Sequence, residues 1–279
     1  MRNPTRRNRN IGTAKSGFSK NNRHKIPQRW SDDRIFWEKL SDLVICPISI
    51  YGHDISLIVE PPRQGSIHAS TPQDIIRVLR HIPDEHLQEI ELIVLRQPKR
   101  KEELLKPVWG RFAYYADLGK YSGPGVYLES VKVGVTIKWG ANLTPFDLKE
   151  LDALRLDGHR VEKTKRGFDI YTTPDTVRNT QLFRTLPHEI GHSVDYLENC
   201  LMPCIRANSE EDADYIRNQY WAKTSIDKEE FANRYAKEFY QKQKVLGNLP
   251  FERLYDEQAL IKMSLKPEWF NFSLKSLKE

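Results

Sequence analysis

The 279-residue chain has no hydrophobic run long enough to cross a membrane. A spanning α-helix needs about 20 apolar residues in succession, and every apolar stretch here is shorter. The N-terminal residues MRNPTRRNRN have no apolar segment behind their charges, so the sequence predicts no secretory signal peptide. These absences exclude a membrane-spanning protein and predict a soluble cytoplasmic one, with export by a signal-less route left open.

Cysteine is also scarce, since the chain has only three. Three cysteines cannot stabilise a chain of this length by disulfides, which favours a reducing compartment. Cys200 and Cys204 stand four positions apart, but without further cysteines or a nearby histidine pair they are a weak metal signal. We therefore expect both to be reduced and partly buried.

Acidic residues are missing from the first 30 positions, and the first one is Asp32. Nine of the 44 Lys and Arg residues lie there, so the remaining 35 stand against all 38 acids, a net charge of −3. The overall charge of +6 therefore comes from the N-terminus. We expect residues 1–30 to form a disordered basic tail. The tail could bind nucleic acid or an acidic partner, or it could only solubilise the chain.

The rest of the chain has the composition of a globular protein, with 39% hydrophobic and 29% charged residues overall. Strand patterns dominate up to residue 174 and helix patterns follow, so we expect one α+β domain over 31–279, with a sheet-rich part (31–174) and a helical part (175–279). Strands are expected at 55–59, 90–95, 112–118, 126–133 and 135–139, with a hairpin at 161–171. Helices are expected at 31–44, from Thr71, from Thr144, and at 175–197, 209–243 and 251–263, with a turn at 121–125.

One short motif carries chemistry, because residues 188–192 read His-Glu-Ile-Gly-His. On a helix, positions i and i+4 share a face, so His188 and His192 can bind one metal ion while Glu189 accepts a proton from metal-bound water. Zinc suits such ligands and lowers the pKa of its water to ~7. A separate apolar stripe of the same helix consists of Phe183, Leu186, Ile190, Val194 and Leu197. The alternative is a helix whose histidines are solvated or hydrogen-bonded in the core.

Catalytic zinc usually has three protein ligands, and two places could supply the third. Glu198 lies six positions after the second histidine, but an unbroken helix turns it away from His188. A downstream helix has an apolar stripe made of Phe231, Ala232, Tyr235, Ala236 and Phe239. Glu229 lies at the flank of that stripe, whereas Glu230 points to the opposite side. We therefore expect Glu229 as the third ligand, with a solvated charge run as the alternative.

The segments HEIGHSVDY and EEFANRY resemble gluzincin metallopeptidases of the anthrax lethal factor and Pro-Pro endopeptidase type. Those proteins combine a helix of the form HExGHxxD with a later helix of the form ExFA, whose first Glu binds zinc. The positions that match the two motifs are His188, Glu189, Gly191, His192, Asp195, Glu229, Phe231 and Ala232. The resemblance covers roughly residues 183–240 and implies a zincin-like fold with one catalytic zinc ion.

The resemblance also implies roles for residues around the zinc ligands. The family places a tyrosine that stabilises the developing oxyanion shortly before the ligand Glu. Tyr220 is the nearest candidate, about two positions further from Glu229 than in the family, and Tyr215 or a purely structural tyrosine are the alternatives. Asp195, which shares a helix face with His188, would orient His192 or be a surface residue. Asn233 stands where relatives often carry an acid.

The expected function is therefore zinc-dependent hydrolysis of a polypeptide, with Glu189 as the general base. The edge strand of the sheet would hold an extended substrate by backbone pairing. Two alternatives stay open: a zincin-fold regulatory or interaction protein without turnover, and a nucleic-acid-associated protein that acts through residues 1–30.

Overall fold

The structure is a computed structural model that describes residues 34–105, 108–132 and 134–271. Contacts between Cα atoms divide the chain into two units, Met1–Phe36 and Trp37–Glu279. The expected basic tail at 1–30 lies outside the described residues. The second unit has a mixed α+β fold.

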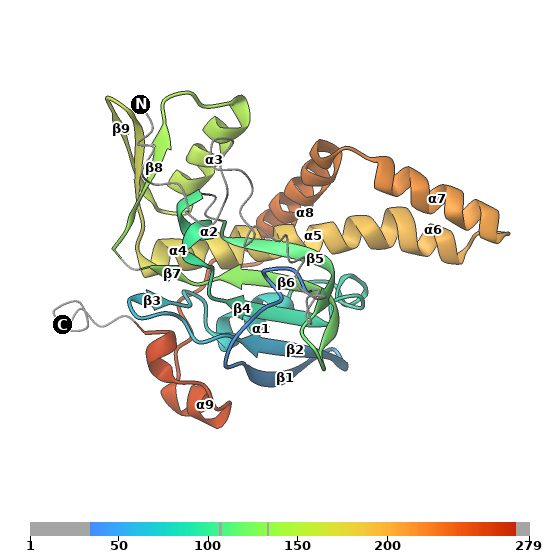
Figure 1. The fold of residues 1–279 in the computed structure, drawn as a ribbon, viewed down its shortest axis with the longest axis horizontal. Coiled ribbons are helices and arrows are strands. Elements are labelled where there is room, and N and C mark those ends of the chain that lie inside the picture. The colour runs from blue at the N-terminus through green and yellow to red at the C-terminus, as the bar shows by residue number, and fades with distance from the viewer. Residues whose placement is uncertain (1–33, 106–107, 133, 272–279) are drawn as a thin grey trace, which may run out of the picture. The chain divides into compact units, whose positions relative to one another are not determined.

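A five-stranded sheet forms the centre of this unit, with the strand order β1-β2-β4-β6-β5. Its strands are β1 (Val44–Ile50), β2 (His53–Val59), β4 (Leu92–Arg96), β6 (Ser122–Glu129) and β5 (Gly110–Asp117). The three inner strands are parallel, and both edge strands run antiparallel to their neighbours. Figure 1 shows β5 at the edge of the sheet beside the helix α5 (Leu186–Tyr196).

The buried parts of the inner strands, such as 92–95 and 126–128, are apolar because both faces of the sheet are covered. On one face lie α1 (Pro72–Leu79) and α5 in the main hydrophobic core. On the other face, sheet side chains such as Tyr127 form a smaller cluster, and Trp37 and Leu40 pack against it. α1 begins with the expected capping box, in which Thr71 and Asp74 exchange hydrogen bonds between side chain and backbone.

A second, three-stranded sheet has the order β8-β10-β9 and is antiparallel throughout. Its elements are β8 (Thr136–Gly140), β9 (Arg160–Thr164) and β10 (Gly167–Tyr171), with α3 (Pro145–Leu156) between β8 and β9. Leu151 and Leu154 of α3 pack on Ile170, so this part has a small core of its own. A two-stranded pair, β3 (Ser66–Ile67) with β7 (Val131–Lys132), completes the described strands.

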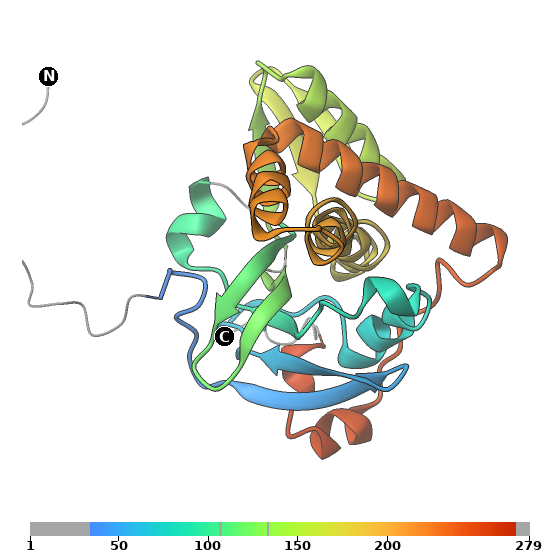
Figure 2. The same ribbon diagram turned by 90° about the vertical axis from the view of Figure 1, so that its right-hand side faces the viewer.

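Helices dominate the chain after residue 173. A nearly continuous helical stretch consists of α4 (Pro174–Thr180), η3 (Gln181–Thr185), α5, η4 (Leu197–Leu201) and α6 (Met202–Ile205), where η3 and η4 are π-helical. The other helical elements are η2 (Asp84–His86), α2 (Arg100–Leu105), α7 (Glu210–Ala222), α8 (Ser225–Val245), α9 (Glu257–Lys262) and η5 (Pro267–Trp269). α7 runs back along η4 and α6, and Figure 2 shows α5 end-on between α8 and the sheet.

Most of the expected elements are confirmed, but three expectations are wrong. The helix expected at 31–44 is absent from its described part, since residues 34–43 form turns and irregular backbone and Val44 begins a strand. The helical spacing arises because Trp37, Leu40 and Leu43 pack on the sheet from an irregular segment. The helix expected at 251–263 covers only Glu257–Lys262.

The turn expected at 121–125 is also misplaced. The chain turns earlier, where the backbone N–H of Leu118 donates to the carbonyl of Tyr121 at 2.9 Å. Gly123 and Gly125 instead belong to β6 and allow a close approach to β4. A Cβ atom on Gly125 would lie only 2.9 Å from the Cβ atom of Leu92. These glycines therefore serve strand packing rather than the turn.

Within the described residues, no helix is long and apolar enough to cross a membrane.

Candidate functional site

The His-Glu-Ile-Gly-His motif lies on α5, which packs directly on α8 (Figure 2). Gly191 is at the closest approach, because a Cβ atom there would lie 3.0 Å from the Cα atom of Ala232. The capping box of Thr224 and Asp227 fixes where α8 begins, four residues before Glu229. The close contact at Gly191 therefore sets the spacing of the two helices, and the cap places Glu229 at the start of α8.

The two helices bring His188, His192 and Glu229 together. The Nε2 atom of His188 lies 3.2 Å from Oε2 of Glu229, and that of His192 lies 3.6 Å from Oε1. One ligand atom from each residue falls within 4.8 Å of the others. Both imidazole rings are mostly buried, whereas the Glu229 side chain is 47% exposed, so the cluster opens to solvent on the side of Glu229.

This donor set fits a zinc ion. Imidazole nitrogen and carboxylate oxygen bind zinc at about 2.0–2.2 Å, so two ligands in a tetrahedral site lie about 3.3 Å apart. The two His–Glu distances of 3.2 and 3.6 Å fall around that value. Three protein ligands leave the fourth position for water or substrate, as in catalytic sites.

Glu189 lies beside the cluster but is buried, with 8% of its surface exposed. Burial raises the pKa of its carboxyl to about 7, although the charge of His188 and a hydrogen bond from the backbone N–H of Phe112 oppose the shift. Phe112 belongs to the edge strand β5, and its ring lies nearly parallel to that of His192 at 6.5 Å. A carboxyl group with such a pKa can both accept and release a proton near neutral pH.

The pKa values of the three clustered side chains reflect their contacts. Burial lowers the pKa of His192 to about 4, and the charge of His188 acts in the same direction. For His188, burial is outweighed by the hydrogen bond to Glu229 and the nearby carboxylates, so its pKa is raised. A side-chain hydrogen bond with Asn233 adds to that increase. The hydrogen bond from His188 lowers the pKa of Glu229.

Asp195 lies on α5, one turn after His192, and is 1% exposed. The Tyr220 hydroxyl donates to its Oδ2 atom at 3.1 Å, and Lys223 and Asn199 donate to its Oδ1 atom at 3.2 and 2.9 Å. Asp195 is therefore not a surface residue. Tyr220 and Lys223 hold the C-terminal end of α7 against α5 through these hydrogen bonds.

Tyr220, the expected oxyanion-stabilising residue, is 1% exposed. Its hydroxyl lies 3.1 Å from that of Tyr114 on β5. Because the Tyr220 proton points to Asp195, Tyr114 must be the donor of the second hydrogen bond. Burial and the Tyr114 hydroxyl raise the pKa of Tyr220, so its proton is held firmly. Donation to an oxyanion by Tyr220 requires its hydroxyl to turn away from Asp195.

Comparison of the chain with protein-family models, with curated proteins and with solved structures finds no match in any of the three. Function must therefore be argued from the site itself.

The alternative residues considered from the sequence lie apart from the cluster. Glu198 lies 3.9 Å from Nε2 of His86, and Glu230 is exposed on α8. Tyr215 is 66% exposed on α7. Cys200 and Cys204 are free thiols, the first buried and the second partly buried, as expected.

Sequence reasoning missed an aromatic cluster next to the site. The ammonium of Lys228 lies 4.7 Å from the ring centre of Trp221, 4.8 Å from that of Tyr220 and 6.0 Å from that of Tyr114. Lys228 directly precedes Glu229, and its charge contributes to the low pKa of His192. No sequence pattern could connect Tyr114 with residues more than 100 positions away, because only the packing of β5 against the helices brings them together.

Proposed function

We propose that the chain is a zinc-dependent metallopeptidase with a zincin-like fold, and that its zinc ligands are two histidines and a glutamate as in gluzincins. The observation that carries the proposal is the meeting of His188, His192 and Glu229 from two separate helices, with the buried carboxyl of Glu189 beside them. A pair of histidines on one helix face could arise by chance. A third ligand of suitable chemistry at 3.2 and 3.6 Å, supplied by another helix, is a more specific arrangement.

The sheet supports the same proposal. β5 is an edge strand that runs antiparallel to β6, and Phe112 and Tyr114 of β5 lie against α5 and α7. An edge strand has unpaired backbone groups, which can hold an extended peptide by added strand pairing. A polypeptide held along β5 would present its carbonyl groups near Glu189.

Each residue then has a task in hydrolysis. His188, His192 and Glu229 would hold the zinc ion, which when bound would activate a water molecule and polarise the scissile carbonyl. Glu189 takes the proton from the attacking water, and its pKa of about 7 allows it to pass that proton to the leaving amine. Tyr220, once turned from Asp195, would donate to the developing oxyanion.

The test is cleavage of a peptide library, read by mass spectrometry, with the Glu189→Gln variant beside the wild-type protein. Glutamine keeps the shape of the side chain but cannot accept the proton. We expect turnover to fall by about 10²–10⁴-fold while bound zinc remains. A wild-type protein that holds zinc but cleaves nothing would contradict the proposal and favour a regulatory or interaction protein.

The oxyanion role needs its own variants, Tyr220→Phe and Tyr114→Phe. Loss of the donating hydroxyl from Tyr220 should lower kcat by about 10²–10³-fold with little change in KM. Tyr114→Phe removes a donor to Tyr220 and should have a smaller effect. Equal activity of the wild-type protein and Tyr220→Phe would assign Tyr220 a purely structural role.

A further inference from the structure

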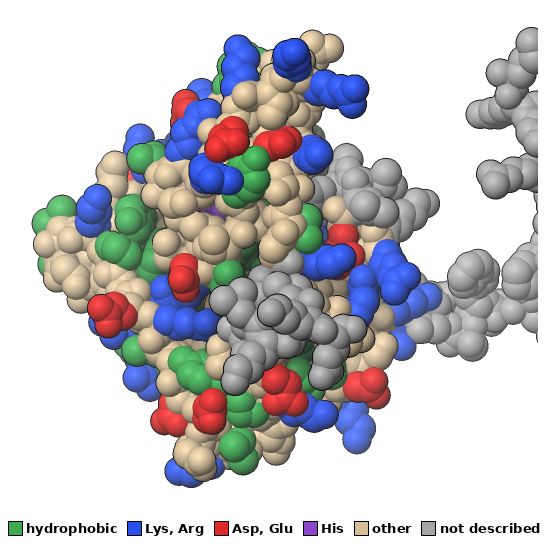
Figure 3. Space-filling model, turned by 90° about the vertical axis from the view of Figure 1, so that its left-hand side faces the viewer, with side chains coloured by type: hydrophobic (Ala, Val, Ile, Leu, Met, Phe, Trp, Pro, Cys, Tyr) green, Lys and Arg blue, Asp and Glu red, His purple; other side chains and the backbone are tan. Residues whose placement is uncertain are grey.

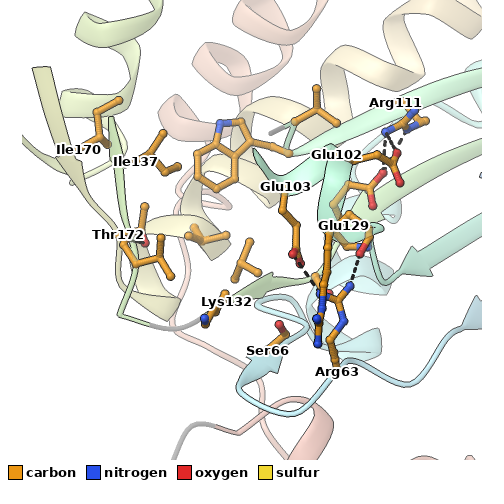
Figure 4. Close-up of a pocket in the computed structure, with 18 of the residues that line it drawn as sticks. Arg63, Ser66, Glu102, Glu103, Arg111, Glu129, Lys132, Ile137, Ile170 and Thr172 are labelled. Atoms are coloured by element: carbon orange, nitrogen blue, oxygen red, sulfur yellow. Dashed lines mark hydrogen bonds and ion pairs between the residues drawn. The ribbon is translucent and has the colours of Figure 1, made fainter. Parts of the chain in front are cut away.

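A cavity lies between the five-stranded and the three-stranded sheet and shares no residue with the His–Glu cluster, defined as His188, His192 and Glu229. Its volume is about 480 Å³, and its walls come from β3, β7, β8, β10, α2, α3, α4 and the first residues of β5. Figure 4 shows Ile137 and Ile170 on one side of it and Arg63, Ser66 and Lys132 at one end. This volume is within the range of sites for small molecules, about 300–1,000 Å³.

One side of the cavity is apolar and well supported. Ile137 and Ile170 are direct cross-strand partners on the same face of the three-stranded sheet, and Leu154 of α3 packs behind them. The Trp109 ring stacks on His159, with centroids 5.6 Å apart. At the mouth, Val135 leaves 38% of its surface exposed to water. A ligand that covers such side chains would gain hydrophobic stabilisation.

The opposite side is charged, but its carboxylates already have partners. Glu103 pairs with Arg63 at 3.1 Å. Glu102 and Glu129 pair with Arg96 at 2.5 and 2.8 Å, and both also contact Arg111. The acids that line the cavity are thus offset by guanidinium groups before any ligand arrives.

Lys132 and Arg100 add positive charge to this side. Both are exposed, and within the described part of the chain neither is paired with a carboxylate. Other Lys and Arg side chains gather over the three-stranded sheet on the same face of the molecule (Figure 3). The charge that this end of the cavity leaves unmatched is therefore positive, and it would attract an anion.

We propose that this cavity binds a small amphipathic carboxylate, with its apolar body between Trp109 and Ile137 and its carboxylate at Lys132. A purely apolar ligand would make no ion pair with the Lys132 ammonium. A purely polar anion would leave the apolar side chains of the cavity exposed to water. The carboxylate could be carried by an aliphatic chain or by an aromatic ring system, which share this chemistry.

Calorimetric titration of the full chain with octanoate and with 2-naphthoate tests the proposal. It also distinguishes an aliphatic from an aromatic apolar group in the ligand. We expect saturable one-site binding of at least one of them, with a Kd below about 1 mM. Neutral 1-octanol should bind at least tenfold more weakly than octanoate. Failure of both carboxylates to bind, or equal binding of octanol and octanoate, would overturn the proposal.

Two charge reversals provide a matched pair. Lys132→Glu changes an exposed residue of the cavity, and we expect it to weaken binding of the carboxylate at least tenfold. Lys138→Glu makes the same change on the outer face of β8, outside the cavity, and should alter Kd less than twofold. Equal effects of the two variants would show only general electrostatic attraction and would overturn the assigned position.

The proposal does not depend on peptidase activity. Octanoate or naphthoate should bind equally well to the wild-type protein, to the chelator-treated protein and to Glu189→Gln, because the cavity shares no residue with the His–Glu cluster. Binding that disappears with the metal would place the ligand at the His–Glu cluster and contradict the second site.

Discussion

Two carboxylate clusters in the described part of the chain differ in their partners. In the sheet cluster, defined as Arg96, Glu102, Arg111 and Glu129, both carboxylates contact both guanidinium groups at 2.5–3.5 Å. In the helix cluster, defined as His188, Glu189, His192 and Glu229, the partners of Glu229 are imidazole rings. Glu189 is held there by a backbone N–H.

The difference separates stability from function. Two arginines and two glutamates balance their own charge, so the sheet cluster is complete as it stands. The helix cluster has two carboxyl groups and two histidines, of which His192 has its pKa lowered to about 4 and is neutral at neutral pH. A divalent cation would supply the charge that the helix cluster lacks. The sheet cluster should therefore affect folding, and the helix cluster should affect metal binding.

Removing the proposed metal ligands is the most direct test of whether the helix cluster binds metal. His188→Ala, His192→Ala and Glu229→Ala should each lose most bound zinc and, with it, the activity. Glu230→Ala is the matched control, since Glu230 is an exposed neighbour on the same helix. Zinc content per chain measures the result. Zinc loss in Glu230→Ala or Glu198→Ala, but not in Glu229→Ala, would mean that Glu229 is not the third ligand.

The converse experiment addresses the sheet cluster. Glu129→Ala leaves the buried guanidinium of Arg96 without one of its partners, and we expect it to lower the free energy of unfolding by about 3–5 kcal/mol. Bound zinc should remain in the folded protein. Glu162→Ala removes an exposed ion pair with Arg160 and should cost less than about 1 kcal/mol. Urea unfolding compares them, and similar costs would remove the distinction between the buried and exposed pairs.

His68 is a buried side chain outside both clusters, and it makes the free energy of unfolding depend on pH. Burial lowers its pKa to about 4, so the folded protein binds its proton only below that value. The unfolded chain binds the proton near pH 6.5, and stability is therefore lost as the pH falls through this interval. We expect a loss of about 2 kcal/mol between pH 7 and pH 5 from this residue. His68→Gln should lack this loss. Urea unfolding at pH 7 and pH 5 should therefore show a fall in the free energy of unfolding about 2 kcal/mol smaller than in the wild-type protein.

The smallest effect should come from charges outside both clusters. Deletion of residues 1–30 removes nine basic residues but none of the residues of either cluster. We expect the melting temperature, zinc content and hydrolysis of a short neutral peptide to stay nearly unchanged. If the tail binds an acidic partner or nucleic acid, its deletion should weaken that binding mainly at low salt. A marked fall in thermal stability would show that these residues contribute to the fold.

The sequence predicted best where one local signal decides the structure. Thr71 and Thr144 each precede a proline and stand three positions before an aspartate, and both begin helices with capping boxes. The flank of an apolar stripe selected Glu229, and the structure places this residue, rather than Glu230, beside the histidines. In each case the deciding residues lie within a few positions of one another.

The sequence predicted least where distant segments decide the structure. β1 was missed because the segment before it has apolar residues at helical spacing, and only its contacts with the sheet distinguish the two interpretations. The contact between Tyr114 and Tyr220 arises from packing of β5 against α7, and the cavity lined by Trp109 arises where several strands and helices meet. Neither has a signal in the local sequence, since each joins residues from different elements.

The two π-helical segments that flank α5 have a consequence for how this chain could vary. A π-helical turn contains one more residue than an α-helical turn, so η3 and η4 separate the rotational phase of α5 from those of α4 and α6. Pro187 lacks the N–H that a continuous α-helix would need at its position, which is consistent with such a break. Removing one residue from η3 would convert its π-helical turn into an α-helical turn and leave α4 and α5 in nearly the same relative rotation. Removing one residue within α5 would instead rotate its two parts by about 100° relative to each other. Single-residue deletions should therefore be tolerated in η3 and η4 but not within α5, whose α-helical spacing places His188 and His192 on one face.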